Sequence, residues 1–243
     1  MQAFDIVIVG GGIVGLTQAL ALEKSGLSIA VVESNESQGM PSGSPQLRVS
    51  ALTLATENIL YNLGAWQNLD LNRLCSYENM QVWDQHSFGK IAFKAAQVQQ
   101  QQLGHIVENN VIQSSLIEVL QASPDVTLFY PSKMKTLDFT DDGRRLVTLD
   151  TGERLSTRLV VGADGPNSAV RDLAGLSVER NDYGQKGLVA VVKSEQGHQD
   201  TAWQRFLPGG PLAFLPLNNG YSSIVWTLPS DKADYHLKQS ESE

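Results

Sequence analysis

The first 33 residues contain a glycine-rich turn between an apolar run and a helical pattern. Residues 4–9 are almost continuously apolar, which is typical of a strand buried on both faces of a parallel sheet. The pattern Gly10-x-Gly12-x-x-Gly15 follows directly. Apolar residues then recur at helical spacing up to a glycine that suits a C-cap, namely Leu16, Ala19, Leu20, Leu22 and Gly26. A second apolar run, 28–32, ends at Glu33, so the order predicts a strand, a glycine turn, a helix, a strand and an acid.

Each part of this unit has a physical role if a dinucleotide binds there. Gly10 permits the tight turn, Gly12 lets a pyrophosphate approach the backbone, and Gly15 lets the helix lie close to the strand. The start of the helix offers unpaired N–H groups to the phosphates. Glu33 can accept the hydroxyls of an adenosine ribose and would repel a 2′-phosphate, which disfavours NADP. The motif alone leaves FAD and NAD both open, and a plain βα turn is the alternative.

Composition excludes several other functions. The net charge of −8 argues against a nucleic-acid partner, because phosphate neutralisation needs clustered Lys and Arg. Cys75 is the single cysteine, so no intramolecular disulfide can form, and we expect a passive thiol and a cytoplasmic location. The four histidines show no ligand spacing, so we expect no metal. No apolar run reaches the roughly 20 residues that span a bilayer, and we expect no transmembrane segment.

The middle of the chain reads as alternating helices, strands and turns. We expect a helix over 52–63, capped by Thr53 or Ser50, and a second helix that starts at Asn109 or Asn110 and ends before Pro124. Residues 95–102 read as a loop or a polar strand edge. Strands are expected, in several cases as hairpins, at 80–83, 91–93, 126–129, 133–139, 145–149 and 159–161.

After residue 177 the chain changes character. Four short strands with Gly, Pro or Asn turns are expected at 188–192, 202–207, 212–217 and 222–228, and the residues from Ser230 on are polar. We therefore predict an α/β fold with a discontinuous Rossmann-like domain and a second, mainly antiparallel β-sheet domain. The predicted segments are 1–76 and 105–177 for the cofactor domain, and 77–104 and 178–243 for the substrate domain.

A second motif, Asp164-Gly165-Pro166-Asn167-Ser168-Ala169-Val170-Arg171, follows the strand predicted at 159–161. An acid at a strand end can accept a ribitol or ribose hydroxyl, and the glycine keeps the backbone open. The alternative is a loop in which Asp164 and Ser168 cap a helix that begins near Pro166, with Arg171 on the surface.

The two motifs together resemble the FAD-dependent aromatic hydroxylases typified by para-hydroxybenzoate hydroxylase. Further stretches resemble the ubiquinone-biosynthesis hydroxylases, with the 2-octaprenylphenol hydroxylase group as the nearest match over essentially the whole chain. These stretches are Gln46-Leu47-Arg48-Val49-Ser50-Ala51, Leu63-Gly64-Ala65-Trp66, Gly104-His105-Ile106-Val107-Glu108-Asn109, Val161-Gly162-Ala163-Asp164-Gly165 and Ala213-Phe214-Leu215-Pro216-Leu217.

The resemblance implies a set of cofactor contacts. Arg48, which could otherwise form a surface salt bridge, would lie near the flavin, and Gln113 would lie near the start of a helix that contacts the cofactor, where the family often has Arg. The expected FAD-binding residues are Gly10, Gly12, Ile13, Val14, Gly15, Glu33, Arg48, Gln113, Asp164, Gly165, Ser168 and Arg171.

The resemblance also implies a reaction. NAD(P)H would reduce FAD, O₂ would add to the flavin, and the flavin hydroperoxide would hydroxylate the aromatic ring of a polyprenylated phenol or quinol in ubiquinone biosynthesis. No catalytic side chain is named, because the flavin carries the difficult step. The resemblance also implies a multiprotein biosynthetic complex and peripheral contact with a membrane.

One departure from the family pattern keeps other functions open. The family has a third motif, Gly-Asp followed by small residues and His, and a helical tail; neither is present, so the chain resembles the N-terminal part only. The sequence therefore leaves open whether such a part binds FAD tightly, weakly or not at all, and whether it is active. The alternatives are a flavin reductase or dehydrogenase on the same fold, and a non-catalytic fragment or scaffold subunit.

Overall fold

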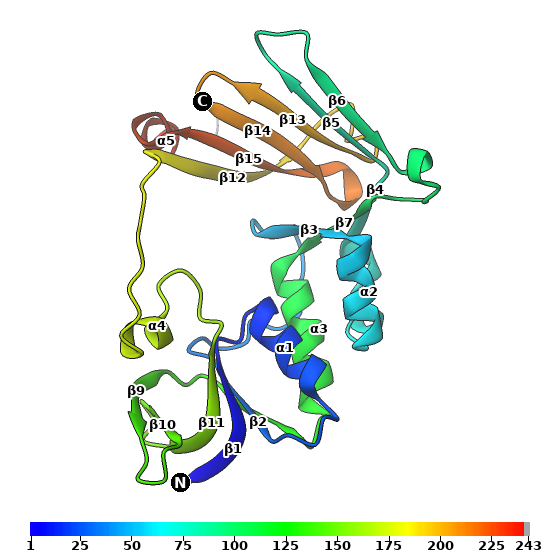
Figure 1. Ribbon diagram of the computed structural model, residues 1–243. Coiled ribbons are helices and arrows are strands. Elements are labelled where there is room, and N and C mark those ends of the chain that lie inside the picture. The colour runs from blue at the N-terminus through cyan, green and yellow to red at the C-terminus, as the bar shows by residue number, and fades with distance from the viewer. Residues whose placement is uncertain (241–243) are drawn as a thin grey trace. The chain divides into compact units, whose positions relative to one another are not determined.

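The computed structural model describes residues 1–240, and the chain divides into two compact units (Figure 1). The first unit comprises Met1–Met40, Leu60–Asn68 and Ile112–Glu179. The second comprises Pro41–Ile59, Leu69–Val111 and the residues from Arg180 on. The domain bounds predicted from the sequence stay a prediction; the compact units differ from them at residues 41–59, 69–76 and 105–111, which lie in the second unit, and at 178–179, which lie in the first.

The first unit is built on one six-stranded sheet. Its strands, in their order across the sheet, are β8 (Val126–Phe129), β2 (Ile29–Val32), β1 (Gln2–Val9), β11 (Arg154–Gly162), β10 (Arg145–Leu149) and β9 (Met134–Phe139). The first four run parallel, and β10 and β9 continue the sheet in antiparallel fashion. Strand β2 is buried at all four positions, as its apolar sequence predicts for a central parallel strand.

Two helices of this unit follow the strand ends. Helix α1 (Ile13–Leu22) contacts β1 and β2 and buries the apolar residues Leu16, Ala19 and Leu20. The short helix α4 (Ala169–Leu173) follows β11 and contacts both β11 and β9. Together the strand–helix–strand order and the parallel sheet confirm the predicted Rossmann-like α/β architecture.

Two further helices cross from one unit to the other along the chain. Helix α2 (Leu54–Asn62) follows β3, and helix α3 (Asn109–Gln121) follows β7. The part of α3 from Ile112 on belongs to the first unit and buries Ile112, Leu116 and Leu120 almost completely.

The second unit contains two sheets. The larger has the order β12 (Gln185–Lys193), β15 (Tyr221–Pro229), β14 (Gly210–Pro216), β13 (Thr201–Leu207), β5 (Asn79–Asp84) and β6 (Lys90–Lys94). It is antiparallel except where β13 pairs with β5. The smaller, antiparallel sheet has the order β3 (Val49–Thr53), β7 (Gly104–Glu108) and β4 (Leu74–Tyr77). The predicted second, mainly antiparallel sheet is therefore confirmed.

Some predicted elements differ from the structure. The helix expected over 52–63 starts at Leu54, and Thr53 is the capping residue, since its Oγ1 accepts the N–H of Thr56 at 3.4 Å. The helix expected from Pro166 starts at Ala169. Residues 95–98 form a 3₁₀ turn within the stretch read as a loop.

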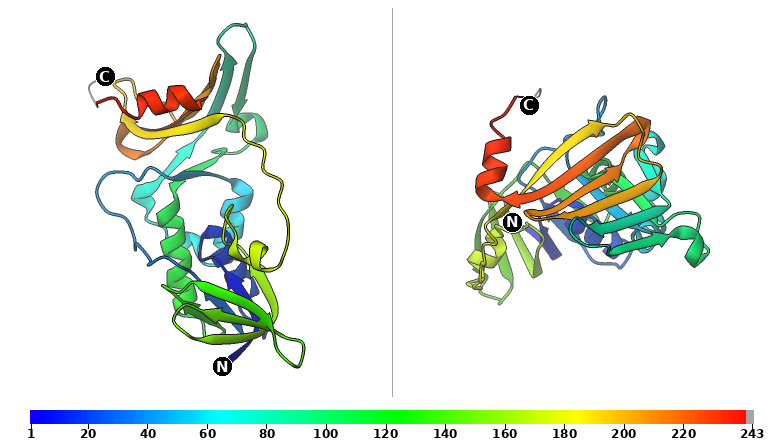
Figure 2. Two further views of the ribbon diagram at one scale, coloured as in Figure 1. Left: turned by 90° about the vertical axis from the view of Figure 1, so that its left-hand side faces the viewer. Right: turned by 90° about the horizontal axis from the view of Figure 1, so that it is seen from above.

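The polar residues from Ser230 on form a helix that the sequence reading did not predict, α5 (Ser230–His236). It lies beside β12 and β15, as the second view of Figure 2 shows. Among residues 1–240, no helix has both the length and the apolar sequence that crossing a membrane requires.

Candidate functional site

The carboxyl ends of β1 and β11 meet at the point where the strand order reverses. The connection that follows β1 leads through α1 to β2, on one side of β1. The connection that follows β11 leads to α4, which contacts β11 and β9 on the other side. The N–H of Gly10 donates to the carbonyl of Val32 at 2.8 Å, and the N–H of Ala163 donates to the carbonyl of Val9 at 2.7 Å. Ligands of open α/β sheets bind at such a switch point.

A cavity of about 370 Å³ opens at this edge of the sheet. Residues of both sequence motifs line it, including Gly10, Gly12, Glu33, Asp164 and Gly165. Two segments 152 residues apart in the chain, around Gly12 and around Asp164, therefore share one concave surface. A single extended ligand can contact both.

The three glycines of the first motif have different surroundings. A methyl group on Gly10 would overlap the carbonyl oxygen of Ala163, and one on Gly15 would overlap the carbonyl oxygen of Gly10. Gly10 also has a φ of +110°, which disfavours any side chain. A methyl on Gly12 would meet no atom within 4 Å. Gly10 and Gly15 therefore permit close packing, whereas Gly12 leaves open space beside the cavity.

The start of α1 supplies hydrogen-bond donors at this open side. Gly12 is the N-cap residue, and no side chain caps the helix. The N–H groups of the first turn, which includes Ile13 and Val14, have no partner inside the helix. Such a helix start attracts phosphate groups through its free N–H groups and its dipole.

Glu33 connects the end of β2 to the glycine turn. Its Oε2 accepts the N–H of Gly11 at 2.7 Å, and its Oε1 accepts the backbone and side-chain N–H groups of Asn35, each at 2.8 Å. A carboxylate offers about four acceptor positions, so Oε2 keeps one for a further donor. Ribose binding by Glu33 stays a prediction that this spare position allows.

The Asp164 loop makes the helix-capping contacts that the sequence offered as the alternative to cofactor binding. Asp164 Oδ1 accepts the hydroxyl of Ser168 at 2.6 Å, Oδ2 accepts the N–H of Val170 at 3.1 Å, and Ser168 Oγ accepts the N–H of Arg171 at 3.0 Å. Asp164 and Gly165 nevertheless line the cavity. The capping contacts thus fix the loop at the place where it borders the cavity.

Ser168 and Arg171 do not line this cavity. They border a separate hollow of about 690 Å³ between α4 and β9–β11. Arg171 is held there by the carbonyl of Pro166 at 3.0 Å and by the carboxylate of Asp172 at 3.2 Å. In this arrangement Ser168 and Arg171 support the loop, and direct contact between Arg171 and a cofactor stays a prediction.

Gln113 contacts the glycine turn. Its Nε2 donates to the carbonyl of Gly11 at 2.6 Å, so helix α3 holds the glycine turn that precedes α1. Sequence reasoning missed Asn35 and Lys133, which also line the cavity. Lys133 gave no signal, because it reads as the first residue of a strand.

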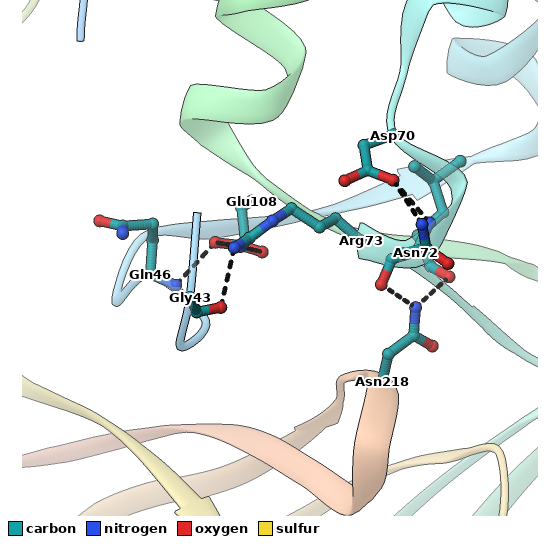
Figure 3. A network of polar contacts seen from close by, with 8 residues as sticks. Gly43, Gln46, Asp70, Asn72, Arg73, Glu108 and Asn218 are labelled. Carbon is teal, nitrogen blue, oxygen red and sulfur yellow. Dashed lines mark hydrogen bonds and ion pairs between the residues drawn. The ribbon is translucent and has the colours of Figure 1, made fainter. Parts of the chain in front are cut away.

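Arg48 belongs to the second unit, and its side chain is exposed. The segment before it is fixed by a buried ion pair between Arg73 and Glu108, with Nη1 at 2.6 Å from Oε1 (Figure 3). Arg73 Nη2 donates to the carbonyl of Gly43 at 2.9 Å, and Glu108 Oε2 accepts the N–H of Gln46 at 2.7 Å. The cofactor role of Arg48 stays a prediction.

A family model described as an FAD binding domain matches residues 3–243. This chain belongs to the FAD-binding domain family. The glycine motif alone left both FAD and NAD open, and membership in this family identifies FAD as the cofactor. The observed cavity fits that cofactor, because an open glycine, uncapped helix N–H groups and an acid with a spare acceptor position line it or border it.

This FAD-binding domain has curated relatives among the ubiquinone hydroxylases. It is 38% identical over 226 residues to the 3-demethoxyubiquinol 3-hydroxylase of Escherichia coli K12, covering 93% of the chain and 57% of the relative. It is 36% identical over 255 residues to the mitochondrial ubiquinone biosynthesis monooxygenase COQ6 of Danio rerio, covering 99% and 52%. The predicted resemblance is confirmed, and the chain spans about half the length of these relatives.

Solved monooxygenases share the fold of this FAD-binding domain. The p-nitrophenol 4-monooxygenase PnpA of Pseudomonas putida is 23% identical with a TM-score of 0.77, over 98% of the chain and 62% of that structure. PqsL of P. aeruginosa, solved in complex with 2-aminobenzoylacetate, is 21% identical with a TM-score of 0.79, over 96% and 63%. This likeness confirms the predicted fold of the para-hydroxybenzoate hydroxylase type.

Proposed function

We propose that the chain is the FAD-binding part of a monooxygenase that hydroxylates the ring of a polyprenylated phenol or quinol. The observation that carries the proposal is the single cavity that both motifs line at the switch point of the sheet. The substrate class rests on the relatives, which are named as ubiquinone hydroxylases and monooxygenases. NAD(P)H is the proposed reductant and O₂ the proposed oxidant.

The residues of the chain would bind and orient the cofactor. Gly12 and the first turn of α1 would face the pyrophosphate, and Glu33 would accept a ribose hydroxyl with the spare position on Oε2. Asp164 and Gly165 would border the flavin side of the cofactor. When bound, FAD supplies electron transfer from NAD(P)H and the activation of O₂ for ring hydroxylation.

The finer roles of the other predicted residues are part of this proposal. Arg48 is proposed to contact the flavin on the basis of the family resemblance, and Ser168 and Arg171 to hold the Asp164 loop. Because the proposed substrate carries a lipid tail, we also propose that the protein contacts a membrane surface and assembles in a biosynthetic complex. A cytoplasmic location is proposed because the one cysteine, Cys75, is free and buried; cell fractionation tests it.

The experiment that tests the function measures how closely NAD(P)H oxidation is coupled to hydroxylation of the substrate. The chain, reconstituted with FAD, is supplied with NAD(P)H, O₂ and a short-chain prenylphenol, and the oxidised NAD(P)H is compared with the hydroxylated product. One hydroxyl group formed for each molecule of O₂ consumed supports a monooxygenase. NAD(P)H oxidation without product indicates a flavin reductase, and a chain that never takes up FAD indicates a scaffold subunit.

A further inference from the structure

The peptide groups of Gly11 are held on both sides by side chains from other elements. The N–H of Gly11 donates to Glu33 Oε2 at 2.7 Å, at the end of β2. The carbonyl of Gly11 accepts a hydrogen bond from Gln113 Nε2 at 2.6 Å, on helix α3. A methyl group on Gly11 would come within 2.7 Å of Cβ of Glu33, so the side chain of Glu33 also packs on this glycine.

The hydrogen bond from Gln113 determines where the next N–H points. The peptide bond between Gly11 and Gly12 is trans, since the cis bond in the described part of the chain is at Tyr130–Pro131. In a trans peptide the C=O and the following N–H point in opposite directions. Because the carbonyl of Gly11 points at Gln113, the N–H of Gly12 points away from it. Gly12 lines the cavity of about 370 Å³, and Gln113 does not.

Three consecutive glycines would otherwise leave this turn free to change conformation. Glycine loses more conformational freedom on folding than any other residue, so Gly10-Gly11-Gly12 has little backbone preference of its own. A rotated Gly11–Gly12 peptide would direct a carbonyl oxygen, instead of an N–H, toward a bound phosphate. A donor on α3 that holds the carbonyl of Gly11 removes this alternative.

We propose that Gln113 is a positioning residue that, with Glu33, fixes the Gly11 peptide so that the N–H of Gly12 faces the cofactor pyrophosphate. This inference rests on the proposed FAD site and replaces the expected direct contact of Gln113 with the cofactor. Glutamine suits the role because it donates without charge, whereas glutamate would only accept and leucine would do neither.

The test uses Gln113→Leu, which removes the donor at nearly the same volume. The matched control is Gln121→Leu on the same helix, whose amide donates to the hydroxyl of Tyr130 at 2.9 Å. Affinities for FAD, ADP and adenosine are measured by titration calorimetry on the 243-residue chain. ADP and adenosine share the adenosine part, and only ADP carries the pyrophosphate.

We expect Gln113→Leu to weaken FAD and ADP binding by about tenfold and to leave adenosine binding unchanged. Gln121→Leu should change none of the three affinities. Gln113→Arg, which restores a donor, should recover most of the ADP affinity. Equal ADP affinity in the wild type and a folded Gln113→Leu variant overturns the inference, as does a loss that is the same for ADP and adenosine.

A measurement on the ligand-free chain separates this inference from the proposed function. Amide ¹H–¹⁵N spectra of ¹⁵N-labelled protein report the hydrogen exchange of Gly11 and Gly12. We expect Gln113→Leu to speed the exchange of the Gly11 amide by about tenfold, because the turn is released. Unchanged exchange overturns the positioning role. Faster exchange in a chain that binds neither FAD nor ADP instead overturns the proposed site.

Discussion

Gly12 and Gly15 belong to one motif, but a side chain would be tolerated at only one of them. Gly12 has a φ of −73° and a ψ of 176°, a region that alanine adopts readily, and its surroundings are open. A methyl on Gly15 would overlap the backbone carbonyl of Gly10.

We therefore expect Gly12→Ala to keep or slightly raise the free energy of unfolding, by up to about 1 kcal/mol, and Gly15→Ala to lower it by about 1–3 kcal/mol. Urea unfolding followed by circular dichroism gives both values. Equal losses in the two variants would show that the glycine turn is packed differently from this structure.

Cys75 is free and buried, and burial disfavours its reactive thiolate form. Burial, and to a smaller extent the negative charge of Asp200, raises the pKa of its thiol to about 11. The thiolate is the reactive form, so labelling of the folded protein by a disulfide reagent should be slow at pH 8 and should accelerate as the pH approaches 11.

The raised pKa of Cys75 also gives stability a pH dependence. The folded thiol keeps its proton to higher pH than the unfolded thiol, whose reference pKa is 9.0. This contribution is present in full below pH 9 and is lost as the pH rises through about 11. Labelling rates measured from pH 7 to about 11 test the assignment, with urea-unfolded protein as the control. Fast labelling of the folded chain at pH 8 would contradict it.

At the scale of elements, the Arg73–Glu108 pair joins the start of β4 to the end of β7 and to the segment 43–46. The two side chains are 10% and 3% exposed. Removing one partner leaves the other charge buried without compensation, and replacing both by apolar residues removes that cost.

We expect Arg73→Ala to lower the free energy of unfolding by about 3–5 kcal/mol. Arg73→Met combined with Glu108→Leu should recover most of this loss, whereas Arg154→Ala, at an exposed arginine, should change stability by less than about 0.5 kcal/mol. Chemical unfolding of the wild type and the three variants gives these differences in the free energy of unfolding. A loss below about 1 kcal/mol in Arg73→Ala would mean that the pair is solvated.

The elements that could be predicted are those whose own sequence determines their environment. Strand β2 is apolar throughout, as is β1 from Ile6 to Val9, because both faces of the sheet are covered there, and α1 shows its buried stripe in its spacing. Helix α5 has a polar sequence, and its packing involves β12, a strand far from it in the chain: Lys186 Nζ donates to Asp234 Oδ1, 48 positions away, at 2.6 Å. Short-range patterns do not contain such contacts.

The candidate site likewise has features that the local sequence predicts and features that depend on long-range contacts. The motif glycines could be predicted because a turn and a close approach require glycine at fixed spacing. The bond from Gln113 to Gly11 joins residues 102 positions apart, and no local pattern contains it. Likewise, the capping contacts of Asp164 were one of two readings of the sequence, and only coordinates show that the capped loop also borders the cavity.

At the scale of the whole molecule, the chain is an FAD-binding domain that spans about half the length of these relatives. If FAD binds the folded chain and not the unfolded one, FAD at 100 times its dissociation constant should raise the free energy of unfolding by about 2.7 kcal/mol. The thermal midpoint measured against FAD concentration gives this shift, with riboflavin as the control that lacks the pyrophosphate and adenosine. A midpoint independent of FAD would contradict binding to the native state.

The central claim is that the pyrophosphate of FAD lies against the open face of Gly12. The most direct measurement is the dissociation constant of FAD for the wild-type chain and for Gly12→Ala, determined by flavin fluorescence on samples that circular dichroism shows to be folded. We predict saturable binding to the wild type and at least tenfold weaker binding to the variant, roughly 1.4 kcal/mol or more. Equal affinity of the two chains, or no binding by the wild type, would contradict the account.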